Sequence, residues 1–309
     1  MLFLTLAAGL ALLILGGEVL LRGAVALSLR LGLSPLFVGL TVVGFGTSTP
    51  ELFTSLQAAY SGAPDIALGN VIGSNIANAL LILGAAALMA PIVVRRAALL
   101  RDGAAVMLAT LACLGLAMTG SFTRLSGVLL LAGLVAYLVY AWKTEAAEGP
   151  DPELENGART LSPVAAFALT AVGIALTLLG ARFLVSGAVD LATTLGVSEA
   201  VIGLTIVAVG TSLPELVTSI MAARKGQPEL ALGNVLGSNI YNILGILGAT
   251  ALLAPAPLDA TAMIPDAMVM LAATALMLFL ATTGWRITRK EGVALVAPYA
   301  AYIVWLGAA

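Results

Sequence analysis

The heptapeptide GTSTPEL occupies Gly46 to Leu52, inside a stretch that is otherwise apolar enough to cross a membrane. A near copy, GTSLPEL, occupies Gly210 to Leu216. Each copy combines a glycine, hydroxyl side chains, a proline and an ionisable glutamate. Because a charge at the bilayer centre costs about 2.5–3.5 kcal/mol on insertion scales, two glutamates at matched positions indicate function rather than packing.

The two copies belong to a longer internal repeat. Residues 39–84 align without a gap with residues 203–248, and about two thirds of the aligned positions are identical. The same offset aligns RGAVALSLRLG, from Arg22, with SGAVDLATTLG, from Ser186. Self-similarity at a fixed offset is the signature of a repeated structural unit. We therefore predict a first repeat over 1–142, a linker over 143–161 and a second repeat over 162–309.

The composition restricts the class of protein. The chain has 309 residues, of which 61% are hydrophobic and 10% charged, whereas soluble domains contain about 25% charged residues. An integral membrane protein is therefore expected, and a net charge of −2 argues against a nucleic-acid partner. The chain lacks histidine and has a single cysteine, Cys113, which excludes disulfides, zinc fingers and Cys–His catalysis. We expect no cofactor, and a membrane enzyme is the weakest alternative.

The apolar segments predict an all-α membrane protein with ten transmembrane helices. A span needs about 20 predominantly apolar residues. The predicted spans are 2–30, 34–60, 66–90, 98–119, 124–142, 162–194, 198–223, 229–254, 262–283 and 288–306. Five spans per repeat is an odd number, so the second repeat enters the membrane from the opposite side and the two repeats are inverted.

The distribution of basic residues predicts the orientation. Cytoplasmic loops are enriched in Lys and Arg. With the N-terminus outside, most basic residues, such as Arg95 and Lys225, fall in cytoplasmic loops, and Arg124 alone falls in an outer loop. We therefore expect a multi-pass protein of the cell (inner or plasma) membrane, with both termini outside. The linker is expected to be cytoplasmic, with solvated acidic residues, among them Glu145.

The prolines of the two heptapeptides predict broken helices in the second and seventh spans. Pro50 and Pro214 lack an amide proton, and their rings clash with the carbonyls of Gly46 and Gly210, four residues earlier. Unwound backbone at membrane depth is tolerated where it is buried in protein or lines a wet cavity. Inverted repeats with broken helices near the midplane are typical of secondary transporters.

The third and eighth spans carry a second polar motif, GNVIGSNIAN from Gly69 and GNVLGSNIYN from Gly233. Within it, Asn70, Ser74 and Asn78 are spaced by four and share one helix face. Asn75 and Asn239 lie off this stripe and are either part of the site or interhelical hydrogen-bond partners. Together with the glutamates and hydroxyls, the polar groups are all oxygen donors, which suit hard cations such as calcium.

The paired motifs GTSxPE and GNxxGSNIxN, present twice, resemble those of the sodium/calcium exchangers of the cation/calcium antiporter superfamily. The resemblance implies alternating access at a central cation cluster, with the first and sixth spans sliding across it. The ligands it implies are the Gly44 carbonyl, Thr47, Ser48, Glu51, Ser74, Asn78, the Ala208 carbonyl, Thr211, Ser212, Glu215, Ser238 and Asn242. It also implies that a linker this short holds no calcium-sensing domain.

The coupling ion is left open by one departure from the family pattern. Relatives commonly have Asp where this chain has Asn242, so the cluster holds the two negative charges of Glu51 and Glu215. We expect a sodium-driven calcium antiporter with two sodium ions per calcium. A proton-driven antiporter is the alternative, although proton-coupled relatives usually have GNxxE. A passive cation channel is less favoured. The expected partners are the lipid bilayer, Ca²⁺ and Na⁺ (or H⁺), and a monomer is plausible.

Overall fold

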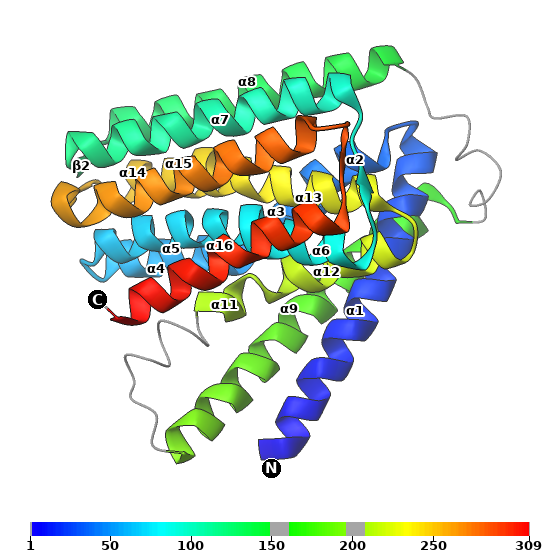
Figure 1. Cartoon of the computed structure of the whole chain (residues 1–309), viewed down its shortest axis with the longest axis horizontal. Helices are drawn as coiled ribbons and strands as arrows, with labels where there is room; N and C mark the ends of the chain where they lie inside the picture. The colour runs from blue at the N-terminus through cyan, green and yellow to red at the C-terminus, as the bar shows by residue number, and fades with distance from the viewer. Residues whose placement is uncertain (1, 149–160, 196–207, 309) are drawn as a thin grey trace.

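The computed structural model describes residues 2–148, 161–195 and 208–308, which are almost entirely helical (Figure 1). The elements of the first half are α1 Leu2–Leu31, α2 Pro35–Val38, η1 Gly39–Val43, α3 Gly44–Thr47, α4 Thr49–Tyr60, α5 Pro64–Ile76, η2 Ala77–Ile82, α6 Leu83–Met89, β1 Ile92–Val93, α7 Arg96–Thr119, β2 Ser121–Phe122 and α8 Arg124–Glu148. Those of the second half are α9 Pro163–Thr194, α11 Ala208–Thr211, α12 Leu213–Arg224, α13 Pro228–Ile240, η5 Tyr241–Leu247, α14 Gly248–Leu253, β3 Ala256–Pro257, α15 Ala260–Thr282, β4 Arg286–Ile287 and α16 Arg289–Ala308.

The helices agree with the predicted class of multi-pass membrane protein. Among the described residues, seven helices are long and apolar enough to cross a membrane. A bent pair, 35–47 with 49–60, qualifies as one further span. The start of the seventh predicted span lies outside the described residues, and α16 is helical without being one of the seven. A total of ten spans therefore stays a prediction.

The predicted linker begins within a helix. Helix α8 continues past residue 142 to Glu148, so the start of the predicted linker is helical. Glu145 was expected to be solvated, but its side chain is only 3% exposed. Burial of its carboxylate is made possible by two arginines and a backbone amide that contact it.

The predicted break in the second span is present, and it lies at Ser48. The backbone leaves helical geometry there, with φ −79° and ψ 11°, and the two helical pieces meet at 44°. Pro50 follows within the first turn of α4, where its missing amide proton costs no helical hydrogen bond. The described part of the seventh span is interrupted in the same way at Ser212, between α11 and α12.

The described residues include three π-helical segments that were not predicted. Segment η1 precedes the break in the second span, while η2 and η5 follow α5 and α13. Asn78 lies in η2 and Asn242 in η5, at matched positions of the repeat. π-helical turns are rare and frequently occur at functional sites. Because a π-helical turn contains an extra residue, it rotates the side chains of Asn78 and Asn242 about the helix axis relative to the preceding α-helix.

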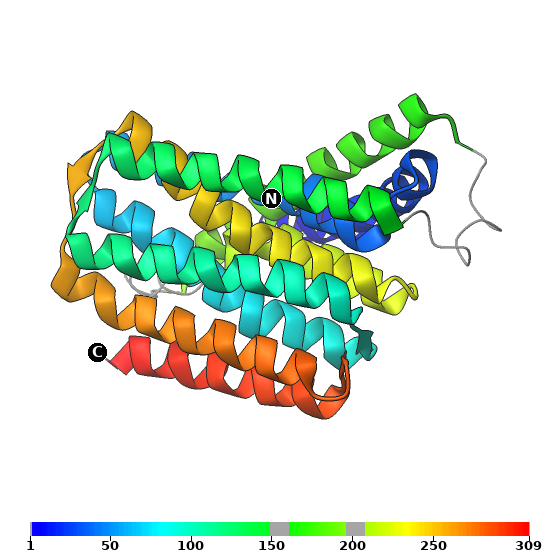
Figure 2. The same cartoon turned by 90° about the horizontal axis from the view of Figure 1, so that it is seen from above.

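Contacts between the two halves are reciprocal. Strand β1 pairs with β4 and β2 with β3, so each short ladder joins one half to the other. Most helices run roughly parallel in the bundle, as Figures 1 and 2 show, whereas α1 and α9 lie side by side and cross the others steeply. Glycines allow this close contact, since a Cβ at Gly16 would lie 2.5 Å from the Thr177 nitrogen and one at Gly180 2.5 Å from the Leu13 nitrogen.

Candidate functional site

Glu51 and Glu215 lie at the two helix breaks. Each is in the first turn of the half-helix that follows the break, α4 or α12, and each is only 1% exposed. Negative charge is favoured near a helix N-terminus, where unpaired backbone N–H groups face outward. The break and the proline therefore place a carboxylate in a favourable position inside the protein.

Each carboxylate is contacted by a serine of the other half. Ser48 Oγ donates to Glu215 Oε1 at 2.9 Å, and Ser212 Oγ donates to Glu51 Oε1 at 3.4 Å. These four residues were predicted to form one site, and the structure brings them together. The exchange of partners between the halves places the two helix breaks beside each other.

Several buried side-chain oxygens have no hydrogen-bond partner in the described part of the chain. Four of them belong to predicted ligands, namely Glu51 Oε2, Glu215 Oε2, Asn78 Oδ1 and Asn242 Oδ1. Leaving a buried polar group unsatisfied costs about 1–3 kcal/mol, and more for a charged group. Four acceptors at repeat-related positions, with no donor provided for them, are what a site for a cation requires.

Asn75 and Asn239, which lie outside the predicted polar helix face, determine the orientation of Asn242 and Asn78. Asn78 Nδ2 donates to Asn239 Oδ1, and Asn242 Nδ2 donates to Asn75 Oδ1, both at 3.0 Å. Asn75 Nδ2 also reaches the Asn239 carbonyl at 3.4 Å. The open question about Asn75 and Asn239 is thereby answered, because both are interhelical hydrogen-bond partners. Because the side-chain nitrogens of Asn78 and Asn242 are already hydrogen-bonded, their side-chain oxygens remain available to bind an ion.

Two further predicted ligands of the first half, Thr47 and the Gly44 carbonyl, already have protein partners. Thr47 Oγ1 donates to the Val43 carbonyl at 3.0 Å and lies 3.3 Å from Asn234 Oδ1. The Gly44 carbonyl accepts from the Ser48 amide at 3.1 Å and from Ser238 Oγ at 3.3 Å. These groups lie next to the glutamates, but their oxygens are shared with the protein.

The other predicted ligands occupy the corresponding elements. Ser74 and Ser238 are buried in α5 and α13. Ala208 and Thr211 are the first and last residues of α11, directly before the break at Ser212. The carbonyl of Gly46, to which Pro50 cannot donate, accepts from Thr49 Oγ1 at 2.8 Å. The corresponding residue of the second repeat is Leu213, which has no hydroxyl, so the two breaks differ here.

Two serines near the site were missed by the sequence analysis. Asn70 Nδ2 donates to Ser55 Oγ at 2.9 Å and to the Glu51 carbonyl at 3.3 Å. Asn234 makes the same pair of contacts with Ser219 and the Glu215 carbonyl, at 2.9 and 3.3 Å. Both serines lie four residues after the glutamate and so share its helix face. That spacing was the signal by which they could have been found.

The chemistry of the site is that of oxygen ligands with two carboxylates. Among the described residues there is no group of three or more His, Cys, Asp or Glu that could hold a metal ion. The available donors are carboxylate, amide and hydroxyl oxygens, which calcium and sodium accept and which zinc and copper do not favour. Buried polar sites between broken helices are typical of membrane proteins that transport ions.

Comparison with known proteins identifies the family. The sequence model of the family described as "Sodium/calcium exchanger protein" matches residues 1–143 and 165–308. The chain belongs to this family.

Relatives of similar length support the assignment. The chain is 41% identical to CaxA of Alkalimonas amylolytica, which is named as a candidate antiporter, with 95% of each chain covered. It is 34% identical to the sodium/calcium exchanger MaX1 of Methanosarcina acetivorans, with 98% of each covered. A solved structure of the sodium-calcium exchanger NCX_Mj superimposes with a TM-score of 0.84 and 33% identity, over 98% of this chain and 99% of the other. The chain is thus an antiporter of the exchanger family in an integral membrane fold.

Proposed function

We propose that this chain exchanges Na⁺ for Ca²⁺ across the membrane by alternating access at the cluster around Glu51 and Glu215. The observation that carries the proposal is the set of four buried, unpaired oxygens contributed equally by the two halves. A bound cation would provide the positively charged partner that the protein itself does not provide for these oxygens. The full proposed ligand set is the group of twelve residues implied by the family motifs.

Charge balance supports competition between the two ions. Two carboxylates neutralise one Ca²⁺ or two Na⁺, and placing excess charge at membrane depth costs several kcal/mol. One ion species must therefore leave before the other is bound. This mutual exclusion couples the two fluxes without any direct contact between the ions.

Sodium is favoured over protons as the coupling ion. The motifs of proton-coupled relatives carry a glutamate after GNxx, where this chain has Gly73 and Gly237. The relatives MaX1 and NCX_Mj are named sodium/calcium exchangers. A proton-driven calcium antiporter remains the second candidate, because the same two carboxylates can carry protons.

The proposed architecture is ten spans in two inverted repeats, 1–142 and 162–309, with the linker in the cytoplasm and both termini outside. The reciprocal contacts support it, since Ser48 contacts Glu215 as Ser212 contacts Glu51. The pairing of β1 with β4 and of β2 with β3 follows the same exchange. The proposed orientation in the membrane is supported by the distribution of basic residues among the loops.

The test is calcium-45 uptake into proteoliposomes under an imposed sodium, proton or potassium gradient, one at a time. An outward sodium gradient should drive uptake, and a proton gradient alone should not. Glu51→Gln should abolish the sodium-driven flux, whereas Asp190→Asn, an exposed carboxylate on α9, should leave it unchanged. Uptake driven by protons and indifferent to sodium would establish the proton-coupled alternative. Uptake that persists with no ion on the opposite side would indicate a channel.

A further inference from the structure

A buried ionic network joins α8 to the start of the second span. Oε1 of Glu145 accepts a hydrogen bond from the backbone N–H of Ser34 at 3.0 Å. Arg101 Nη1, on α7, lies 3.4 Å from the other oxygen of the same carboxylate, and Arg95 Nη2 lies 3.5 Å from Oε1. A single carboxylate thus connects two helices of the bundle with the residue that precedes α2.

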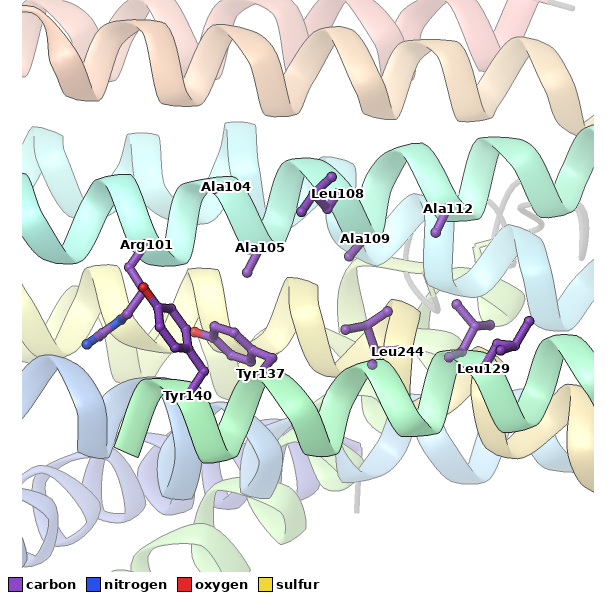
Figure 3. A pocket seen from close by; sticks show the side chains of 12 residues that line it. Arg101, Ala104, Ala105, Leu108, Ala109, Ala112, Leu129, Tyr137, Tyr140 and Leu244 are labelled. Atoms are coloured by element: carbon purple, nitrogen blue, oxygen red, sulfur yellow. The ribbon is translucent and has the colours of Figure 1, made fainter. Parts of the chain in front are cut away.

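The position of the Glu145 carboxylate is fixed by further contacts. Arg101 reaches both oxygens of Asp102, at 2.7 and 3.0 Å, and donates to Thr144 Oγ1 at 2.9 Å. Tyr137 donates to Asp102 Oδ1 at 2.9 Å. Figure 3 shows Arg101 on α7 facing Tyr137 on α8, at one end of an apolar groove of about 500 Å³ between these helices. The network therefore belongs to α7 and α8 rather than to the cation site.

Ser34 lies in the short joint between α1 and the broken second span. Helix α1 ends at Leu31 and α2 begins at Pro35. Within the joint, Gly32 has φ +64°, which turns the chain, and Ser34 Oγ accepts from the Phe37 amide at 3.1 Å. On one side of the joint is a helix packed along α9. On the other side is the span that leads to Ser48 and the candidate site.

The two arginines of the network are present in the first repeat alone. The repeat offset takes Arg95 to Asp259 and Arg101 to Pro265, so the second repeat has no arginine at either position. After a one-residue shift of the offset before α16, Tyr137 corresponds to Tyr302, and the described second half retains this contact, with Tyr302 Oη 3.2 Å from Asp266 Oδ1. The arginine contacts of the network therefore act on the joint between α1 and α2, while the repeat-related joint lies outside the described residues.

We propose that Glu145 is a positioning residue for exchange, which fixes the joint between α1 and the second span and so biases the balance of the two access states. This inference rests on the proposed alternating access. The two access states are related by the pseudo-symmetry of the repeats and are therefore close in free energy. A contact whose arginines are present in the first repeat alone makes the two free energies unequal. The apparent affinity at each membrane face depends on the fraction of protein open to that face.

The transport test compares the apparent KM for calcium at the two faces, in vesicles of known orientation. Glu145→Gln keeps an acceptor for the Ser34 amide but removes the charge that holds Arg101 and Arg95. It should move the two KM values in opposite directions, each by about fivefold, the factor expected for one net hydrogen bond. Lys143→Gln, exposed on the same helix, is the matched control and should move neither. A lower maximal rate with both KM values unchanged would show a structural role only and overturn the proposal.

A second measurement does not depend on transport. Hydrogen exchange of the backbone amides of residues 33–38 should be faster in Glu145→Gln than in the unsubstituted protein, again by about fivefold. Unchanged exchange at this joint would contradict the proposal even if sodium-driven calcium flux were confirmed. Faster exchange in a chain that fails to move calcium would instead count against the proposed function alone. If Glu145→Gln does not insert, Arg95→Gln removes one contact of the same network and gives the same two readouts.

Discussion

The carbonyl oxygens of Asn78 and Asn242 are available at the cluster because both amide nitrogens are already bonded to asparagines of the opposite half. An amide free to rotate would present nitrogen and oxygen alike, and only the oxygen can bind a cation. The orientation of these two proposed ligands is therefore determined by Asn239 and Asn75.

This arrangement predicts the effect of Asn239→Ala. The substitution removes the acceptor for Asn78 Nδ2, so Asn78 loses its fixed orientation, and calcium affinity should fall by about tenfold, the value of one buried hydrogen bond. Equilibrium calcium-45 binding in detergent measures it. Thr110→Ala, which removes a buried hydroxyl that lies 3.4 Å from Thr274, is the control and should bind calcium normally. Equal affinities in the two variants would be inconsistent with an orienting role.

The charge of the cluster predicts a pH effect in Asn242→Asp. At low pH the new carboxyl is protonated and neutral, so the variant should bind calcium as the unsubstituted protein does. As pH rises the carboxyl ionises and adds a negative charge, and calcium affinity should rise relative to the unsubstituted protein. Binding measured from pH 5 to pH 9 checks this. Parallel pH profiles for the two proteins would show that position 242 does not contribute charge to the site.

At the scale of elements, the contact of α1 with α9 depends on glycine. A Cβ at Gly16 would lie 2.5 Å from the Thr177 nitrogen, and one at Gly173 would lie 2.3 Å from the Leu20 nitrogen. These glycines therefore let the two backbones approach more closely than any side chain would allow, as small residues do between membrane helices.

Gly16→Leu should separate these helices and lower sodium-driven calcium uptake by at least about tenfold, because displacement of packed backbone costs more than about 1.4 kcal/mol. Gly115→Leu is the matched control, since a Cβ at that exposed position of α7 meets no atom within 4 Å. The midpoint temperature of thermal unfolding in detergent should be lower for Gly16→Leu than for the unsubstituted protein, and unchanged for Gly115→Leu. Normal uptake by Gly16→Leu would show that the close contact is dispensable.

Much of the helical structure could be predicted from the sequence, because hydrophobic length and proline chemistry act locally. Pro50 predicted the interruption of the second span, and the structure has it at Ser48. The π segments could not be predicted, since a π turn at Asn78 depends on contacts with a distant helix. The burial of Glu145 was missed for the same reason, because its partners Ser34 and Arg101 are far away in the chain.

The candidate site could be predicted in part. The repeated motif identified Glu51 and Glu215, and the structure brings each to a serine of the opposite half. The roles of Asn75 and Asn239 depended on which direction each amide faces, and helix periodicity does not determine it. Sequence spacing therefore predicts the members of the candidate site, while interhelical packing determines how their side chains are oriented.

At the scale of the whole molecule, the charge of the cluster predicts how exchange responds to voltage. With two carboxylates, the loaded states with one Ca²⁺ or two Na⁺ are both neutral, so exchange should move little net charge. Calcium flux in vesicles with a potential set by a potassium ionophore should then vary little with voltage at equal sodium on both sides. Strong dependence on voltage would contradict two-for-one exchange and indicate a third sodium ion.

The most direct test of the central claim is equilibrium binding of calcium to the purified protein in the presence of increasing sodium. Competition for two shared carboxylates predicts that sodium displaces calcium with a slope near two on a logarithmic plot. Glu51→Gln and Glu215→Gln should each lose calcium binding, while Asp190→Asn should retain it. Calcium bound at unchanged affinity by both glutamine variants, or undisturbed by sodium, would contradict the account.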